Sequence, residues 1–398
     1  MTVAKMSSGR KSKLRALARL MNKQNERLIF VNQQLLDCLD LVVSPKETNF
    51  LLRMGTEPLT YKQAASLTDM PEEQFSKFFE TIIKRGVIRL QHDEQGEERF
   101  ILEAIAVGWL EMQLMNGGET PEQKEFARRT DAYFNSLKKL NIFPLRNLQN
   151  IMVRHTQKPN QSIAAIKPPG EDEKKAEIDV RRTIEVSESK VYPTQSINEI
   201  IEQYGEDNPI GLVHCFCRQW RRFVSEPCRF NLPTEACIMI GDIVEHMVRY
   251  GYGRQISKEE ALAVIEETQD KGAVHTVFYE KDDLRLPRIA ICNCCWDCCG
   301  IMASYHRGIS ALQYKSYYSA QIVDSSSCTG CEKCVKHCPA DTISIIEKKA
   351  VIDSDKCIGC GQCAHQCPKD VITLNFNERS VFLPLKKKSE VRIPEKNI

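Results

Sequence analysis

The chain has 398 residues, of which 42% are hydrophobic and 27% charged, and its net charge is +2. This composition is typical of a soluble globular protein with enough chain for two to four domains, and it excludes a mainly disordered polypeptide. The exception is cysteine: 17 of the 18 cysteines follow residue 214, most of them at short spacings. Disulfide frameworks belong mainly to short secreted chains, so clustered thiols in a chain of this length favour metal ligation.

No run of 18 or more apolar residues occurs, so the sequence predicts no transmembrane segment. The N-terminal residues also lack the apolar stretch and small-residue cleavage site of a secretory signal. We therefore expect the protein in a reducing cytoplasm.

Residues 1–29 predict a basic helical arm. Eight Lys and Arg residues precede residue 28, against the single acidic residue Glu26. Four apolar side chains fall on one face of the helix, namely Leu14, Leu17, Leu20 and Met21. Such a helix packs on its own protein or on a partner, or it makes a peripheral contact with an anionic membrane or a nucleic acid.

Residues 30–115 predict a winged-helix-like domain, with three helices followed by two short strands around the turn DEQG. We expect Asp69 to cap the third helix and Gly86 to end it. The buried stripe of this helix is predicted to be Phe75, Phe78, Phe79, Ile82 and Ile83. Its other face carries three cations and three anions, and this balance disfavours tight DNA binding. Protein contact or scaffolding is the expected role.

Residues 116–190 predict a helical connector followed by a polar linker, and residues 191–320 a cysteine-rich metal-binding domain with α/β character. Within that domain we expect a helix over SINEIIEQY and another over TEACIMIGDIVEHMVRY that ends at Gly251. A third helix follows Ser257, with Glu260 completing a capping box and Gly272 as its stop. IAICNCC is expected to be a short buried strand that delivers cysteines to a site.

A cysteine phrase is repeated within residues 321–376. CTGCEKCVKHCP begins at Cys328 and CIGCGQCAHQCP at Cys357, and the aligned halves share eight of 18 positions. Each half has the spacing C-x2-C-x2-C-x3-C-P, in which three thiolates bind one [4Fe-4S] cluster and the fourth binds the neighbouring cluster. The predicted ligand sets therefore cross. One set is Cys328, Cys331, Cys334 and Cys367, and the other is Cys357, Cys360, Cys363 and Cys338.

This repeat resembles the bacterial-type 2[4Fe-4S] ferredoxin domain over about fifty residues. The resemblance implies two [4Fe-4S] clusters that accept and pass single electrons. Six Lys and six Asp or Glu residues lie between Cys328 and Thr373, so charge does not point to a particular partner. Residues 377–398 form a basic tail.

Nine upstream cysteines fall into two groups, and Cys38 alone is expected to be a core residue. The groups are Cys215, Cys217, Cys228 and Cys237, and then Cys292, Cys294, Cys295, Cys298 and Cys299. Because thiols in a C-x-C unit or an adjacent pair are expected to point apart on a strand, neither group alone suits one cluster, and the two groups are expected to converge.

Three interpretations of this upstream site stay open. They are an additional [4Fe-4S] cluster, a structural zinc site, and thiol redox chemistry through Cys298 and Cys299 or a disulfide. Three neighbouring arginines are expected either to stabilise thiolates at this site or to form a solvated basic face. They are Arg218, Arg221 and Arg222. His214 and His275 are expected to be core or supporting residues rather than ligands.

The order of a CxCR unit, a capped helix and a CNCC unit, followed by the ferredoxin repeat, resembles the 4Fe-4S-binding proteins of anaerobes. The resemblance runs from about Val191 to the C-terminus. It implies an additional iron-sulfur site, with matching positions at Cys215, Cys217, Arg218, Cys292, Cys294 and Cys295. It implies no substrate.

The predicted fold class is therefore α+β and multidomain. It combines an N-terminal winged-helix-like domain, a central cysteine-rich α/β region and a C-terminal ferredoxin-like two-cluster module. No phosphate-binding loop or dinucleotide fingerprint occurs, so flavin and nicotinamide are not expected. The catalytic residues are unknown.

The functional hypothesis is an iron-sulfur electron-transfer protein of anaerobic metabolism, or an oxidoreductase subunit, rather than a stand-alone enzyme. It passes electrons to or from a partner oxidoreductase. Two alternatives remain: a redox-responsive transcriptional regulator that uses the winged helix, and a redox enzyme with an open upstream cluster.

Overall fold

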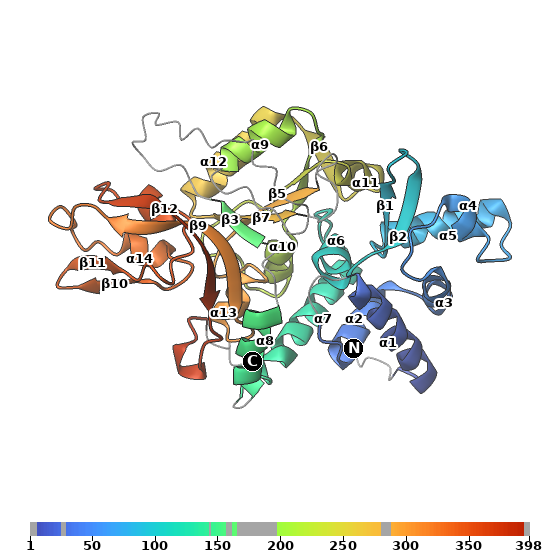
Figure 1. The fold of residues 1–398 in the computed structure, drawn as a ribbon. Coiled ribbons are helices and arrows are strands. Elements are labelled where there is room, and N and C mark those ends of the chain that lie inside the picture. The colour runs from blue at the N-terminus through green and yellow to red at the C-terminus, as the bar shows by residue number, and fades with distance from the viewer. Residues whose placement is uncertain are drawn as a thin grey trace. The chain divides into compact units, whose positions relative to one another are not determined.

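The computed structural model describes residues 6–24, 29–142, 145–156, 161–164, 197–279 and 288–393. The chain forms two compact units (Figure 1). The first comprises Met1–Leu140, Pro209–Cys228 and Asp242–Ile256, and the second comprises Asn141–Asn208, Arg229–Gly241 and Ser257–Ile398. Both units mix helices and strands, in agreement with the predicted α+β class. Among the described residues, no helix is long and apolar enough to cross a membrane.

The first unit is mainly helical around one apolar core. Its elements are α1 (Ser8–Lys23), α2 (Gln33–Val42), α3 (Pro45–Met54), α4 (Tyr61–Ala65), α5 (Glu72–Lys84), β1 (Ile88–His92), β2 (Glu98–Leu102), α6 (Leu110–Met112), α7 (Pro121–Lys138), β4 (Ile210–His214), α10 (Phe216–Phe223), α11 (Ile243–Arg249) and β6 (Gly253–Ile256). Strands β1 and β2 form one antiparallel pair, and β4 and β6 form another.

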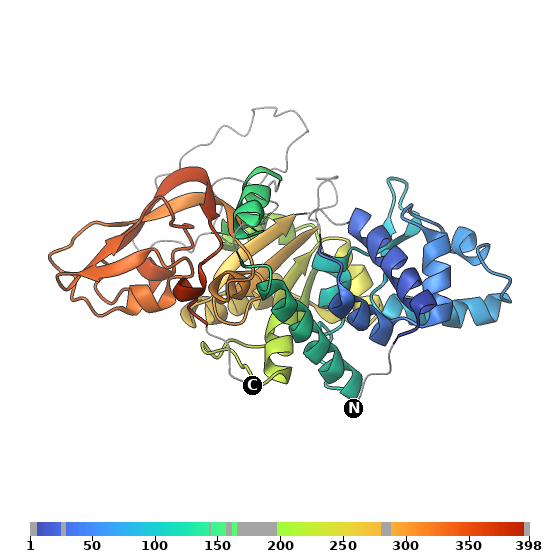
Figure 2. The ribbon, with the colours of Figure 1, turned by 90° about the horizontal axis from the view of Figure 1, so that it is seen from below.

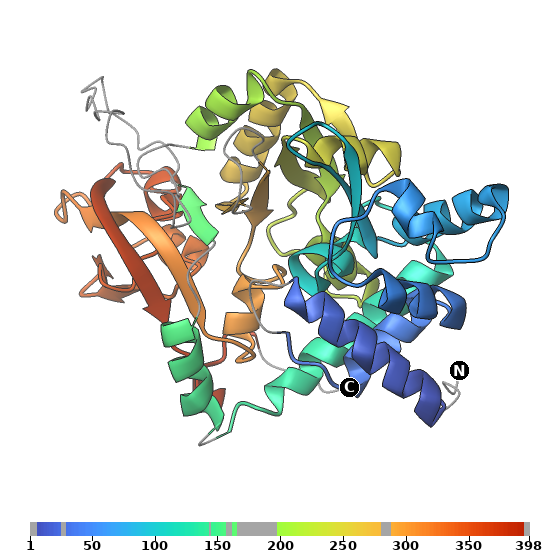
Figure 3. The ribbon, with the colours of Figure 1, turned by 45° about the vertical axis from the view of Figure 1, so that its right-hand side comes forward.

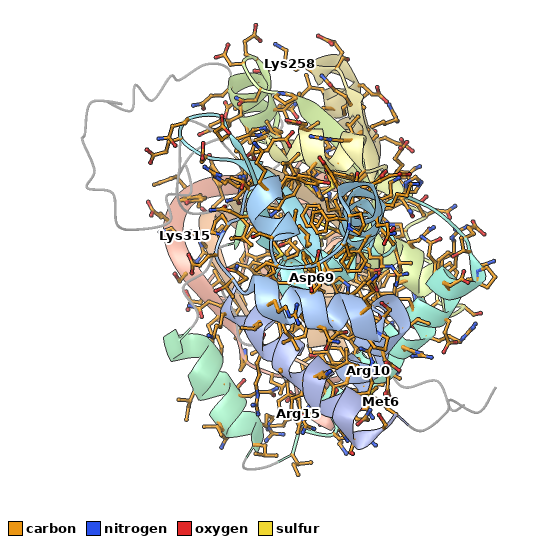
Figure 4. All side chains as sticks on the ribbon, turned by 90° about the vertical axis from the view of Figure 1, so that its right-hand side faces the viewer. Met6, Arg10, Arg15, Asp69, Lys258 and Lys315 are labelled. Carbon is orange, nitrogen blue, oxygen red and sulfur yellow. The ribbon has the colours of Figure 1, made fainter. Side chains whose placement is uncertain are left out.

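Helix α1 packs into the core of the first unit instead of projecting as an arm. Leu14, Leu17 and Met21 have no exposed surface. Arg10 donates to the carboxylate of Asp40 at 2.7 Å, whereas Arg15 is exposed on the outer side; both are labelled in Figure 4. Because the apolar stripe is buried within the protein, it is not available for insertion into a membrane.

The predicted helices and hairpin of residues 30–115 are present, with four helices rather than three before the hairpin. Phe75, Phe79, Ile82 and Ile83 are buried on α5, and Phe78 is half-buried, as predicted. Gly86 follows the helix with φ +68°. The predicted cap at Asp69 is wrong, because Pro71 occupies the N-cap position and no side chain caps the helix.

Cations on the outer face of α5 are paired with carboxylates one turn away. Lys77 Nζ lies 2.7 Å from Glu73, and Lys84 Nζ lies 2.6 Å from Glu80. These pairs leave little net positive charge for phosphate contacts, which agrees with the balance read from the sequence.

The second unit contains a twisted sheet and the repeated cysteine phrase. Its elements are α8 (Leu145–Thr156), β3 (Gln161–Ala164), α9 (Ile197–Gly205), β5 (Glu235–Ile240), α12 (Lys258–Asp270), β7 (Val274–Tyr279), β8 (Ile289–Cys294), α13 (Met302–His306), β9 (Leu312–Ile322), α14 (Lys333–His337), β10 (Ile343–Ile346), β11 (Lys349–Ile352), α15 (Gln362–His365) and β12 (Ile372–Leu383). Most of the predicted polar linker lies outside the described residues, but β3 is a strand within it.

The strand order in this unit is β12-β9-β3-β7-β8-β5. Strands β9 and β12 are the longest, at 11 and 12 residues, and run antiparallel side by side (Figures 2 and 3, orange and red). Strands β3 and β9 pair in parallel. A separate hairpin, β10 with β11, lies between the two cysteine phrases in the sequence.

The helix predicted over TEACIMIGDIVEHMVRY is wrong in its first half. Residues Glu235–Ile240 form strand β5, and only Ile243–Arg249 form a helix. The run ACIMI is apolar on every residue, which suits a strand buried on both faces, and Gly241 with φ +104° interrupts the chain before the helix. The predictions for α9, α12 and β8 are confirmed, and Ser257 accepts from the N–H of Glu260 at the start of α12.

Candidate metal centre

Four cysteines from both halves of the repeat line one cavity. Cys328 and Cys331 lie in the loop before α14, Cys334 lies within α14, and Cys367 follows α15. The cavity is partly open to solvent. Ile345, Ala350, Val371 and Ile372 supply apolar walls.

A second cavity is lined by the other four cysteines of the repeat. Cys357, Cys360 and Cys363 come from the second phrase, and Cys338 comes from the end of the first. Each cavity thus receives three sulfurs from one phrase and one from the other. Four thiols around a cavity with apolar walls are a donor set that fits a [4Fe-4S] cluster.

Backbone N–H groups already point at several of these sulfurs. Ala350 donates to Cys328 Sγ at 3.5 Å, Thr342 to Cys338 Sγ at 3.4 Å and Ala320 to Cys357 Sγ at 3.4 Å. Hydrogen bonds of this kind stabilise negative charge on sulfur and tune the potential of a cluster. Ala320 belongs to β9, so the long strand supports the second cavity directly.

Two glycines allow the phrases to fold closely against neighbouring backbone. Gly330 has φ +67°, and a Cβ atom there would lie 2.5 Å from the carbonyl oxygen of Lys348. Gly359 has φ +68°, and a Cβ atom there would collide with the carbonyl of Tyr318. A side chain is therefore excluded at both positions by conformation and by space.

The two cavities differ in exposure. Cys331 is exposed and Cys328 and Cys367 are half-buried, so the first cavity reaches the surface. All four cysteines of the second cavity are buried. Burial raises the pKa of the Cys338, Cys360 and Cys363 thiols, whereas N–H groups of Ala350 and Gly330 lower that of Cys328.

Arg392 holds the backbone at Cys338 and the nearby Asp341 in place through hydrogen bonds. Arg392 donates to the carbonyl of Cys338 at 2.9 Å and to the carboxylate of Asp341 at 2.7 Å. His306, fully buried, lies 2.8 Å from the carbonyl of Pro339. Burial raises the pKa of Asp341, but His306 and Lys386 outweigh it and hold that pKa well below its usual range.

The upstream cysteines of the second unit gather at strand β8 and the loop after it. Cys292 and Cys294 lie two residues apart on the strand and face the same side, and Cys294 interacts with both Cys292 and Cys299. The prediction that C-x-C thiols point apart is therefore wrong here, because side chains repeat with a period of two along a strand. Cys295, the next residue, lies beyond the end of the strand and has its sulfur beside that of Cys298.

Strand β5 brings Cys237 to the same row. Ile238 pairs with Ile291, and one further step of this antiparallel register places Cys237 opposite Cys292. The side-chain amide of Asn293 donates to the carbonyl of Ala236 at 2.7 Å, which agrees with that step. Residues directly opposite in an antiparallel pair face the same side, so Cys237, Cys292 and Cys294 share one face of the sheet.

Cys295 and Cys298 form a second group in the loop after β8. Their Sγ atoms lie 2.6 Å apart, and Cys295, Asp297 and Cys298 hold their donor atoms within 4.8 Å of one another. All three residues are buried. Trp296, between them, donates its indole N–H to the carbonyl of Lys336 at 3.2 Å.

Cys215, Cys217 and Cys228 belong to the first unit. Cys215 is the N-cap of α10, and Cys217 lies in its first turn. The arginines of α10 are engaged by carboxylates: Arg221 pairs with Asp131 at 2.9 Å, and Arg222 with Glu119 at 2.5 Å.

The remaining cysteine and histidine predictions concern core residues. Cys38 is fully buried, and burial raises the pKa of its thiol to about 12. His275 is also fully buried and lies 2.7 Å from Asn293 Oδ1. Burial lowers the pKa of His275 to about 4, so the ring is neutral at pH 7. Both residues therefore have the core positions that were expected.

The comparisons with known proteins identify one part of the chain. No curated protein and no solved structure matches it significantly. Residues 320–370 match the family model for the 4Fe-4S dicluster domain. The matched range contains every cysteine that lines the two cavities. This region is therefore similar to 4Fe-4S dicluster domains, a similarity that supports at least one [4Fe-4S] cluster and suggests iron-sulfur electron transfer.

Proposed function

We propose that this chain is an electron-transfer protein whose residues 321–376 hold two [4Fe-4S] clusters of the bacterial ferredoxin type. The observation that carries the proposal is the pair of cavities, each lined by four cysteines drawn three from one phrase and one from the other. When bound, [4Fe-4S] clusters accept and donate single electrons. No nucleophile or acid-base pair is needed for that task.

The residues around the cavities have separate roles in this proposal. Apolar side chains such as Ile343, Ile358 and Ile372 exclude water from the sulfurs. N–H groups of Ala320, Ala350 and Thr342 hold negative charge on the sulfurs. Exposure at Cys331 marks the side from which a protein partner approaches, because electron transfer needs a short path to the surface.

We place the additional upstream cluster at the sheet face that carries Cys237, Cys292 and Cys294, with Cys299 from the following loop, whose sulfur lies 3.5 Å from that of Cys294. Thr276 supports this assignment. It pairs with Cys292 across strands β7 and β8, is buried, and its hydroxyl has no hydrogen-bond partner among the described residues. A buried hydroxyl beside a thiol set is a donor for a negatively charged sulfur ligand.

Anaerobic purification, metal analysis and reductive titration test the proposal. The two cavities account for about eight iron atoms and two electrons per chain, and the upstream cluster raises these values to about twelve and three. Dithionite treatment should give the paramagnetic signal of reduced clusters. Protein that carries no iron after anaerobic purification would contradict the electron-transfer function.

Two variants separate the upstream cluster from the other two. The double variant C292A/C294A should lose about four iron atoms and keep about eight. C38A, which removes a buried thiol from the core of the first unit, is the control and should keep all of them. An unchanged iron content in C292A/C294A would remove the upstream assignment and leave the two-cavity proposal intact.

A further inference from the structure

The loop Cys295-Trp296-Asp297-Cys298 contains a second group of metal-binding side chains that is separate from the sheet-face cysteines. Its two sulfurs and one carboxylate oxygen lie within 4.8 Å of one another. Cys295, Asp297 and Cys298 are 1%, 6% and 2% exposed, so the three donors are withdrawn from water together.

The eight-residue sequence CNCCWDCC therefore divides between two sites. Cys294 interacts with Cys292 and Cys299, while Cys295 lies against Cys298. The division coincides with the end of strand β8 at Cys294, because Cys295 is the first residue of the loop that contains Asp297 and Cys298. One cluster cannot use both sets, because a [4Fe-4S] cluster takes four protein ligands.

Charge and orientation at this loop favour a cation. The N–H of Arg229 donates to Asp297 Oδ2 at 2.7 Å, which fixes the carboxylate in place. Cysteine sulfurs and a carboxylate oxygen are ligand types that bind zinc, with the thiols deprotonated as the metal binds. A divalent metal ion coordinated by all three groups therefore suits this set of donors.

We propose that Cys295, Asp297 and Cys298 bind a mononuclear zinc ion. Zinc accepts mixed sulfur and oxygen ligands in tetrahedral sites, with Zn–S near about 2.3 Å and Zn–O near about 2.0–2.2 Å. Two sulfurs around such an ion lie about 3.8 Å apart, so the Cys295 and Cys298 Sγ atoms, which are 2.6 Å apart, must separate when the ion binds. A carboxylate ligand also distinguishes this loop from the all-cysteine sets of the cavities.

The three donors lie within one four-residue loop of the second unit. A structural zinc site is normally completed by a fourth ligand.

The zinc site positions the part of the chain that carries Cys334 and Cys338. Trp296, between the proposed ligands, donates to the carbonyl of Lys336, and the guanidinium of Arg392 stacks 3.7 Å from the Trp296 ring. Arg392 in turn donates to the carbonyls of Lys336 and Cys338. A zinc ion that holds this loop in one conformation would therefore also hold the backbone of α14 and of Cys338 in place.

Metal analysis and zinc K-edge X-ray absorption on the full-length protein test this inference. The protein is expressed in medium with both iron and zinc and purified anaerobically. We expect about one zinc ion per chain, with two or three sulfurs and at least one lighter ligand in its shell. Zinc bound by four sulfurs, or no bound zinc, would overturn the assignment, and neither result depends on a variant that folds poorly.

Two variants link the ion to these residues. C298A and D297N should lose zinc while keeping the iron content of the wild type; in D297N the amide oxygen can still accept from Arg229. C38A is the control and should keep the zinc. Loss of about four iron atoms with no change in zinc would show that the loop serves a cluster instead, and retention of zinc in both variants would also refute the site. The iron in the two cavities is counted separately, so failure of this inference is distinct from failure of the proposed function.

Discussion

Thr342 donates its backbone N–H to the Sγ atom of Cys338, and its hydroxyl lies 3.4 Å from the same sulfur. Cys338 is the residue that the first cysteine phrase contributes to the cavity of the second. Thr342 and Cys338 are both buried, so this sulfur receives its hydrogen bonds from the protein.

Replacing Thr342 by Val should make the reduction potential of one cluster more negative by tens of millivolts. The change removes a donor to the sulfur while keeping the side-chain shape and the backbone N–H, and loss of a hydrogen bond destabilises the more negative reduced state. Redox titration followed by electron paramagnetic resonance measures the shift. S344A, an exposed change two residues further on in strand β10, should leave both potentials in place. Equal shifts in the two variants would argue against a specific contact.

The difference in exposure between the two cavities predicts that the two proposed clusters differ in their sensitivity to oxidants. C360A protein keeps only the cavity that contains the exposed Cys331, and C331A protein keeps only the buried one. Iron release under air should be faster from C360A, because solvent and oxygen reach that cavity more easily. Iron absorbance followed over time makes the comparison. Faster release from C331A would show that burial does not protect the second cavity.

The grouping of the eight cysteines around two cavities could be predicted from the sequence, because their spacing limits which thiols can come together. The hydrogen bonds to these cysteines could not be predicted, since the donors come from distant positions in the chain. Ala320 on β9 and Arg392 near the C-terminus reach Cys357 and Cys338 only through the fold. The sequence around Ala320 or Arg392 contains no pattern that predicts a hydrogen bond to a cysteine.

Errors at the secondary-structure level have local causes. The segment that contains β5 has an apolar run compatible with a helix or a strand, and only Gly241 hinted at the break between β5 and α11. The division of CNCCWDCC into two groups could be predicted only with the exact position of strand β8. A shift of the strand by one residue changes which cysteine side chains share a face.

The burial of α1 predicts a large loss of stability for L17A. Leu17 has no exposed surface and lies in the core of the first unit, so truncation should lower the free energy of unfolding by about 2–5 kcal/mol. R15A on the exposed face should change it by less than about 0.5 kcal/mol. Urea denaturation measures both. A small effect of L17A would mean that α1 is a detachable arm after all.

His246 predicts a loss of stability in mild acid. Burial, reinforced by the charges of Arg89 and Arg249, lowers its pKa from 6.5 to about 3, and its Nδ1 accepts from the N–H of Leu90 at 3.2 Å. Between those pKa values the unfolded state binds the proton and the folded state does not. Stability should therefore fall as pH drops below 6.5, by up to about 1.4 kcal/mol per pH unit.

Hydrogen exchange of the β1 and β2 amides between pH 7.5 and 5.5, corrected for intrinsic rates, reports this loss. H246Q should flatten the pH dependence of protection, whereas H92Q, on β1, should preserve it. An unchanged slope in H246Q would assign the pH dependence to other groups.

The crossed ligand sets are tested most directly by iron content in two double variants of the full-length protein. C331A/C367A removes two cysteines of one cavity and should lose about four iron atoms relative to the wild type, no more than C331A alone. C331A/C338A removes one cysteine from each cavity and should lose about eight. The reverse result, with about eight lost in C331A/C367A and about four in C331A/C338A, would show that each phrase binds its own cluster and would contradict the account.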